Sequence, residues 1–133
     1  MIEHVKHNEI ELAIIIRASF NKDGIEFVTP GEYSQQLAYM NRPEGYRIQP
    51  HVHNPVCREL NDTMEVLFIR NGRVRIDFYD QDQNYLKDGE VATGDTILLA
   101  SGGHGFTMLE PTEMIEVKQG PYAGENDKTR FGK

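Results

Sequence analysis

Hydrophobic and polar residues alternate in short runs along most of the chain, which is the pattern of β-strands. In residues 73–79, Val74, Ile76 and Phe78 alternate with charged residues, so one face of this strand is expected in a core and the other in water. Further short strands are expected at residues 25–29, 34–41, 46–53, 65–70, 85–87, 96–99, 106–109 and 114–118. Many short strands with turn residues between them predict an all-β sandwich or barrel.

Turn residues separate these strands, and one of the turns predicts a pairing. Asn71-Gly72 is the strongest short hairpin signal in the chain, because this dipeptide readily adopts the positive φ angles of a tight turn. It predicts that the strands on either side of it pair with each other. Residues 92–95 and 101–103 are typical of further turns.

The apolar segment at residues 10–18 fits two structures. Asn8 can cap a helix, and Glu9 and Glu11 would lie favourably in its first turn. The apolar residues at alternate positions from Ile10 onward also fit a strand, which isoleucine favours. The capping residues favour one short N-terminal helix in an otherwise all-β chain.

Size, charge and cysteine content restrict the class of protein. The 133 residues, 38% of them hydrophobic, fit one domain at 1–133, with a barrel core at about 25–119 and an irregular tail at 120–133. A net charge of -7 argues against nucleic acid or an anionic membrane as a partner. The longest apolar run, residues 12–16, is too short to span a bilayer, and a single cysteine excludes an internal disulfide. A cytoplasmic protein is therefore expected.

Three histidines and a glutamate are candidate metal ligands. His51 and His53 are two residues apart in an extended segment, so their imidazoles leave it on the same face. Glu65 opens an apolar strand, where a metal ion would offset the cost of burying the carboxylate. His104 follows a glycine turn, from which it can face the same interior. Three nitrogens and one oxygen suit one divalent ion of iron, manganese, nickel, copper or zinc, with open positions for water or substrate.

The spacing of these residues resembles the two motifs of the cupin superfamily. The first motif is matched by Gly45, His51, His53, Glu65 and Gly72. The second motif is matched by Gly94, Gly102 and His104. The resemblance covers about residues 45–108 and implies a jelly-roll barrel (double-stranded β-helix) with one metal ion held by the three histidines and Glu65. It also implies a homodimer formed through N-terminal strands, for which residues 10–16 are suited.

The chain departs from the first cupin motif by an insertion. Eleven residues, 54–64, separate His53 from Glu65, where the family usually has three or four. Because the insertion lies between two expected ligands, it is expected to form a lid or rim over the site. It contains Glu59, which competes with Glu65 as the carboxylate ligand and is the candidate catalytic residue for proton transfer. Cys57 has no recognisable base beside it and is expected to be a spectator.

Further residues are expected to contact a substrate. Counting back from His51 in steps of two places Arg47 and Gln49 on the same inward face. Both are expected to bind substrate, and the Arg47 guanidinium suits a carboxylate or phosphate. The alternative for Arg47 is an ion pair with a nearby acid. Glu116 and Lys118 either reach the cavity or form an exposed pair, and the pair is favoured.

A narrower resemblance concerns the end of the chain. The segment at residues 116–122, followed by Asp127-Lys128 and Phe131, is similar to the ending of the WbuC-type small cupins, which are encoded among bacterial surface-polysaccharide genes. This resemblance implies polysaccharide biosynthesis. The favoured function is a metal-dependent isomerase or epimerase that acts on a sugar, a sugar nucleotide or another small polar molecule. An iron-dependent dioxygenase and a non-catalytic sugar-binding module are the alternatives, because the fold alone does not determine the reaction.

Overall fold

The computed structural model describes residues 1–132, and its regular secondary structure is almost wholly antiparallel strands, which confirms the predicted all-β class. The strands are β1 (Ile2–His7), β2 (Ile10–Ile16), β3 (Gly24–Phe27), β4 (Ala38–Asn41), β5 (Glu65–Asn71), β6 (Arg73–Tyr79), β7 (Tyr85–Ala92), β8 (Thr96–Leu99), β9 (Gly103–Met108) and β10 (Glu113–Lys118). One short 3₁₀ helix, η1 (Gly124–Asp127), follows them. Within residues 1–132, no helix has the length and apolarity needed to cross a membrane.

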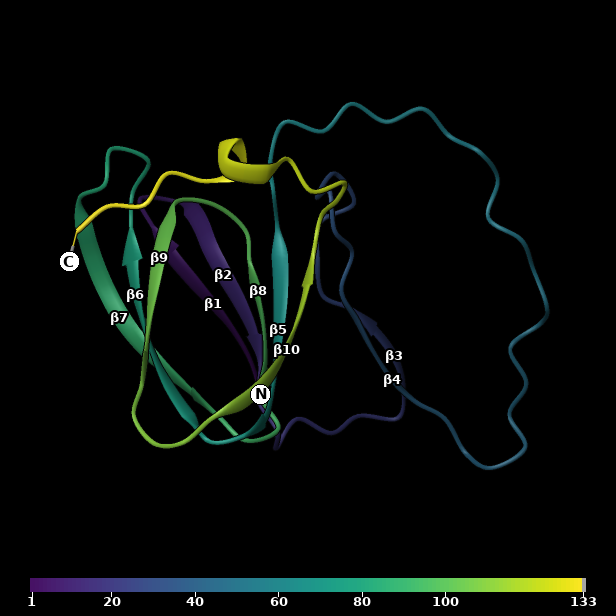
Figure 1. Cartoon of the computed structure of the whole chain (residues 1–133). Coiled ribbons are helices and arrows are strands. Elements are labelled where there is room, and N and C mark those ends of the chain that lie inside the picture. Colours follow the sequence, from purple (N-terminus) through teal and green to yellow (C-terminus); the bar gives the residue numbers. More distant parts are fainter. Residues whose placement is uncertain (133) are drawn as a thin grey trace.

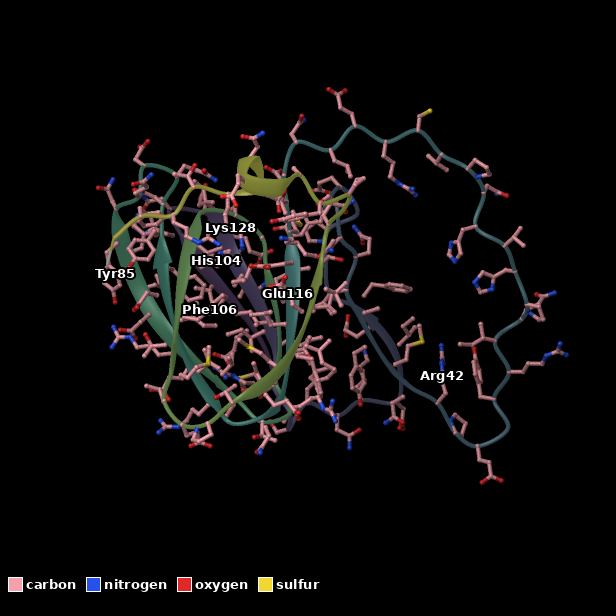
Figure 2. All side chains as sticks on the ribbon, in the orientation of Figure 1. Arg42, Tyr85, His104, Phe106, Glu116 and Lys128 are labelled. Atoms are coloured by element: carbon pink, nitrogen blue, oxygen red, sulfur yellow. The ribbon has the colours of Figure 1, made fainter. Side chains whose placement is uncertain are left out.

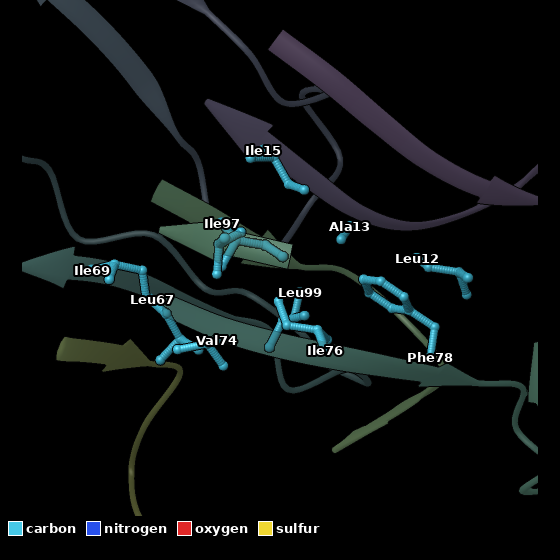
Figure 3. Close-up of a cluster of buried hydrophobic side chains, with 11 residues drawn as sticks. Leu12, Ala13, Ile15, Leu67, Ile69, Val74, Ile76, Phe78, Ile97 and Leu99 are labelled. Atoms are coloured by element: carbon cyan, nitrogen blue, oxygen red, sulfur yellow. The ribbon is translucent and has the colours of Figure 1, made fainter. Parts of the chain in front are cut away.

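Two sheets face each other in a jelly-roll-like arrangement (Figure 1). One sheet has the order β1-β2-β8-β5-β10 and the other the order β7-β6-β9. The side chains between the sheets form the main core, shown in Figure 3: Leu12, Ala13, Ile15, Leu67, Ile69, Val74, Ile76, Phe78, Val91, Ile97 and Leu99. The alternation predicted for residues 73–79 is observed in β6, whose apolar residues are buried while Arg73 and Arg75 are exposed.

The N-terminal segment is a strand, so the predicted short helix is wrong. β2 lies between β1 and β8, and its residues Leu12 to Ile16 are all buried. The five-stranded sheet contributes the main core on one face, and Ile14 packs in a second core with Leu98, Met64 and Ala100. A strand that is buried on both faces carries a continuous apolar run. The residues interpreted as a helix cap, Asn8 and Glu9, instead form the tight turn between β1 and β2 at positive φ angles.

A small hairpin covers part of the five-stranded sheet. β3 and β4 pair only with each other, and the residues between them pack on the second core through Val28, Tyr33 and Leu37. The Tyr33 hydroxyl donates a hydrogen bond of 2.5 Å to Glu11 of β2. This hairpin takes the chain across the outer face of the sheet before the long segment that precedes β5.

The predicted hairpin at Asn71-Gly72 is also wrong, because β5 and β6 belong to different sheets. Both edges of β5 are occupied, by β8 and by β10, so β6 cannot pair with it. Gly72 instead turns the chain from one sheet into the other at a φ of 120°. A Cβ atom at this position would lie 2.7 Å from the Pro111 carbonyl oxygen, which explains why glycine is needed there.

Three other predicted strands differ in extent. Of the segment 34–41 only β4 is a strand, whereas the strand predicted at 85–87 extends through β7 to Ala92. Residues 46–53 form no strand, although one was predicted there. The sheets also include β1 and β2, which lie before the expected core at 25–119.

Candidate functional site

Three strands place acidic and imidazole groups together at one end of the barrel, called the mouth below. Glu65 is the first residue of β5, and His104 is the second residue of β9. The two strands belong to opposite sheets, and their side chains meet with 2.7 Å between His104 Nε2 and Glu65 Oε1. Hydrogen bonding to His104 lowers the pKa of Glu65, so this carboxylate stays ionised against the effect of its burial.

Glu116 adds a second carboxyl group to the mouth (Figure 2). In the pairing of β10 with β5, Lys118 lies opposite Glu65 and Glu116 lies opposite Leu67. The Glu116 carboxyl lies close enough to that of Glu65 for the two groups to influence each other's pKa. Burial raises the pKa of Glu116 and the negative charge of Glu65 raises it further, whereas the charges of Lys118 and Lys128 act in the opposite direction.

The C-terminal segment lies beside this group. Lys118 forms an ion pair of 3.0 Å with Asp127 of η1, and this pairing raises the pKa of Lys118. Lys118 pairs with Asp127 and not with Glu116, so the predicted exposed pair between Glu116 and Lys118 is wrong. They lie two residues apart on one strand, so both face the same side and each meets a neighbour from another element.

Sequence reasoning missed this part of the site because β10 reverses the usual alternation. Its apolar residues Ile115 and Val117 face outward and are 47% and 59% exposed. The charged residues Glu116 and Lys118 lie on the same face of β10 as Met114, which packs against the main core; Lys118 is half-buried, and Glu116, at the open end, is exposed. A charged residue alternating with apolar ones is normally assigned to the water side. The partner register with Glu65 is the signal that identifies the inward face, and it is visible only in the structure.

The two remaining histidines lie on a long segment, residues 42–63, that is called the arm below. No residue of the arm lies in a strand, and all of its residues are exposed. His51 and His53 are neighbours, with ring centroids 5.2 Å apart, and His51 Nδ1 lies 2.8 Å from the Gln49 carbonyl oxygen. In Figure 1 the arm stands away from the barrel. The structure therefore brings the predicted ligands together as two separate pairs.

The predicted substrate-binding residues also lie on the arm. Arg47 and Gln49 are exposed and do not share an inward face, because the strand on which that prediction depended is absent. The backbone N–H of Tyr46 donates to the Pro43 carbonyl oxygen, and the Arg42 guanidinium lies 4.4 Å from the centre of the Tyr46 ring. Both contacts are local, so neither ties the arm to the barrel.

Glu59 and Cys57 lie apart from the mouth. Glu59 lines a groove of about 510 Å³ between the end of the arm and the turn after β3, together with Arg58 and Leu60. Cys57 is exposed. Of the two carboxylates that competed as the predicted ligand, Glu65 is the one beside His104.

The metal ion predicted from the sequence would need its ligands within reach of one another. Within residues 1–132, no three His, Cys, Asp or Glu side chains lie close enough together to hold a metal ion. The donor types nevertheless fit a divalent transition metal, because a neighbouring imidazole and carboxylate lie at the mouth and two neighbouring imidazoles lie on the arm. The donor types therefore suit the metal ion, but the four side chains can bind one ion together only if the arm moves to the mouth.

Comparison of the chain with protein-family models, with curated proteins and with solved structures gives no match.

Proposed function

We propose that this protein binds one divalent transition metal ion at the mouth, through Glu65 and His104 of the barrel and His51 and His53 of the arm. The observation that carries the proposal is the contact of 2.7 Å between His104 and Glu65, which holds an imidazole and an ionised carboxylate together where the two sheets meet. The cupin-like spacings of His51 to His53 and of Glu65 to Gly72 support the same set.

Completion of the site requires the arm to dock on the barrel, and β9 offers an edge for it. β9 pairs with β6 on one side only and is the last strand of its sheet, so the other edge has backbone groups free to pair with an added strand. Residues 46–53 have the length of a strand, and their apolar side chains Tyr46, Ile48 and Val52 are at least half exposed. Docking along β9 would bury these side chains and would bring His51 and His53 toward His104.

The reaction that we propose is an isomerisation or epimerisation of a sugar or another small polar molecule in polysaccharide biosynthesis. When bound, the metal ion would supply Lewis-acid polarisation of a carbonyl or hydroxyl group. Glu116 lies beside Glu65 without being one of the proposed ligands, so its carboxyl is placed to exchange a proton with a bound molecule. The reaction class and the pathway rest on the cupin and WbuC-type resemblance.

The test is elemental analysis of protein purified without a histidine tag. We expect about one metal ion per chain in the wild type and loss of the ion in His51→Ala and in His104→Ala. His7→Ala is the matched control, because His7 lies on β1 and its side chain hydrogen-bonds only to Asn8 within residues 1–132. Wild-type protein that is metal-free and cannot be loaded would refute the proposal, as would full metal in both site variants.

The carboxylate ligand is tested by a second pair of variants. Glu65→Gln should lower the metal affinity at least about 10- to 100-fold, because that loss is typical of removing a residue that only orients a ligand and Glu65 is a proposed direct ligand. Glu59→Gln should leave the affinity unchanged, because Glu59 lies in the groove and not beside His104. The reverse outcome would assign the carboxylate to Glu59.

A further inference from the structure

The C-terminal segment is part of the mouth and not a free tail. After β10 the chain passes through η1 and runs across the end of the barrel toward the three-stranded sheet (Figure 1). The ion pair between Lys118 and Asp127 fixes the segment at one side. The Asp127 side chain is only 9% exposed, so this contact is well shielded from water.

An aromatic contact fixes the other side. The Phe131 ring packs edge-on against Tyr79 with 4.9 Å between centroids. It also covers Gly103, where a Cβ atom would lie 3.1 Å from the nearest carbon of the Phe131 ring. Gly103 precedes His104, so the end of the chain is anchored directly beside the proposed site.

Lys128 lies between these two anchors. Figure 2 shows Lys128 at the same end of the barrel as His104, and its positive charge acts on the Glu116 carboxyl. Among residues 1–132, no carboxylate forms an ion pair with Lys128, whereas the neighbouring Lys118 is paired with Asp127. Within residues 1–132 the mouth thus has one ammonium group without an ion-pair partner, that of the exposed Lys128, whose backbone follows the anchored Asp127.

We propose that Lys128 binds an anionic group, a carboxylate or a phosphate, of the molecule that enters the mouth. An ammonium group recognises such oxygens as a point charge, and its hydrogen bonds to an anion are stronger than those between neutral groups. Anchoring on both sides lowers the entropy lost when the segment orders around a ligand. This inference rests on the proposed function for the location of the site, and it restricts the substrate class to acidic small molecules such as sugar phosphates or sugar acids.

The sequence-based expectation assigned this anion to Arg47. Arg47 is exposed on the arm, and no contact with the barrel holds it at the mouth. Lys128 occupies that position without any movement of the arm. The two assignments therefore predict different results for protein whose arm is free. Anion binding at the mouth requires docking of the arm if Arg47 binds the anion, but not if Lys128 does.

The test is two titrations of metal-free protein, one with inorganic phosphate and one with acetate. Each titration is monitored by the amide chemical shifts in ¹H–¹⁵N NMR spectra. We expect saturable shifts centred on residues 103–105, 116–118 and 127–129. Lys128→Gln should weaken the binding at least about 10-fold, the lower end of the range for one charge-assisted hydrogen bond. Arg130→Gln is the matched control from the same segment and should bind as the wild type does. Saturation with phosphate alone or acetate alone would decide which anion the site takes.

Equal binding by wild type and Lys128→Gln, or no saturable shifts with either anion, would overturn the inference. Because the protein is metal-free, a failure here is separate from a failure of the metal proposal. A second pair of variants tests the anchor: Gly103→Ala should displace Phe131 and weaken anion binding, whereas Gly105→Ala should not, because its Cβ would meet only a Tyr79 ring carbon at 4.0 Å.

Discussion

The mouth and the arm carry the two halves of one predicted site, yet they are held in different ways. At the mouth, β5 is paired on both sides and β9 is paired with β6, so the backbone fixes Glu65 and His104 before any ligand is present. The arm has no strand partner in residues 1–132, and its histidines contact only each other and the adjacent backbone. A motif thus locates residues in space only where hydrogen bonds between strands hold the segment that carries it.

The composition of the arm helps to explain its separation from the barrel. Pro43, Pro50 and Pro55 lack backbone donors and favour extended conformations in themselves and in the residues before them. The insertion at residues 54–64 lengthens the connection to β5, which adds little entropic cost to closing the loop. A stiff and extended segment on a long connection can lie away from the barrel and can still reach it.

The largest expected difference between the two regions is in susceptibility to proteolysis. Cleavage of the barrel requires global opening, which typically costs at least about 5 kcal/mol, whereas the arm is already exposed. Limited proteolysis followed by mass spectrometry should therefore show cleavage within residues 42–63 at least about 1000-fold faster than elsewhere. Loading with a divalent metal ion should slow that cleavage if the arm docks. Barrel cleavage as fast as arm cleavage would contradict the comparison.

A pair of glycines gives the next largest difference, this time in stability. Gly72→Ala would force a Cβ against Thr112 and the Pro111 carbonyl at a positive φ, and should lower the free energy of unfolding by about 3 kcal/mol. Gly45→Ala lies in the arm, with no atom near the new Cβ, and should cost less than about 0.5 kcal/mol because the arm backbone can relax. Urea unfolding curves of both variants measure the contrast, and equal losses would refute it.

The smallest expected effect concerns a contact at the edge of the barrel. The Arg17 guanidinium hydrogen-bonds to Glu3 across β1 and β2, and this lowers the pKa of Glu3 from its ordinary value of 4.5. Because the folded-state pKa is the lower one, the contact stabilises the fold above pH 4.5, and this stabilisation is lost as the pH falls through the folded-state pKa. Glu3 is half-exposed, so Glu3→Gln should cost no more than about 1 kcal/mol at pH 7. A cost that is the same at pH 7 and at pH 3, measured by thermal unfolding, would contradict this assignment.

The elements that the sequence predicted well are those with one buried face and one solvent-exposed face. β6 is such a strand, and its alternation identified its core residues Val74, Ile76 and Phe78. β2 was assigned to a helix because Asn8 and Glu9 were interpreted as its cap, whereas they form the turn between β1 and β2. The turn at Gly72 was located correctly but its role was wrong, because the dipeptide specifies a backbone conformation and not which strands pair.

The candidate site was predicted in part for the same physical reason. Glu65 and His104 were predicted from spacing, and the structure places them in contact. Glu116 and Lys118 were assigned to the outside because the apolar side chains of β10 point outward, which no local pattern reveals. For Lys128 the sequence indicated only that its segment resembles the ending of the WbuC-type cupins. Its position at the mouth could not be predicted, because it depends on distant contacts such as that of Phe131 with Tyr79.

The exposed cysteine makes the position of the arm directly observable. Cys57 is the only cysteine of the chain and lies on the arm, so a thiol-reactive fluorophore or spin label attaches there and nowhere else, without any engineered mutation. A second label on the barrel would turn docking of the arm into a change of distance between two probes. The residue that takes no part in the proposed chemistry is therefore the one through which the assembly of the site can be followed in real time.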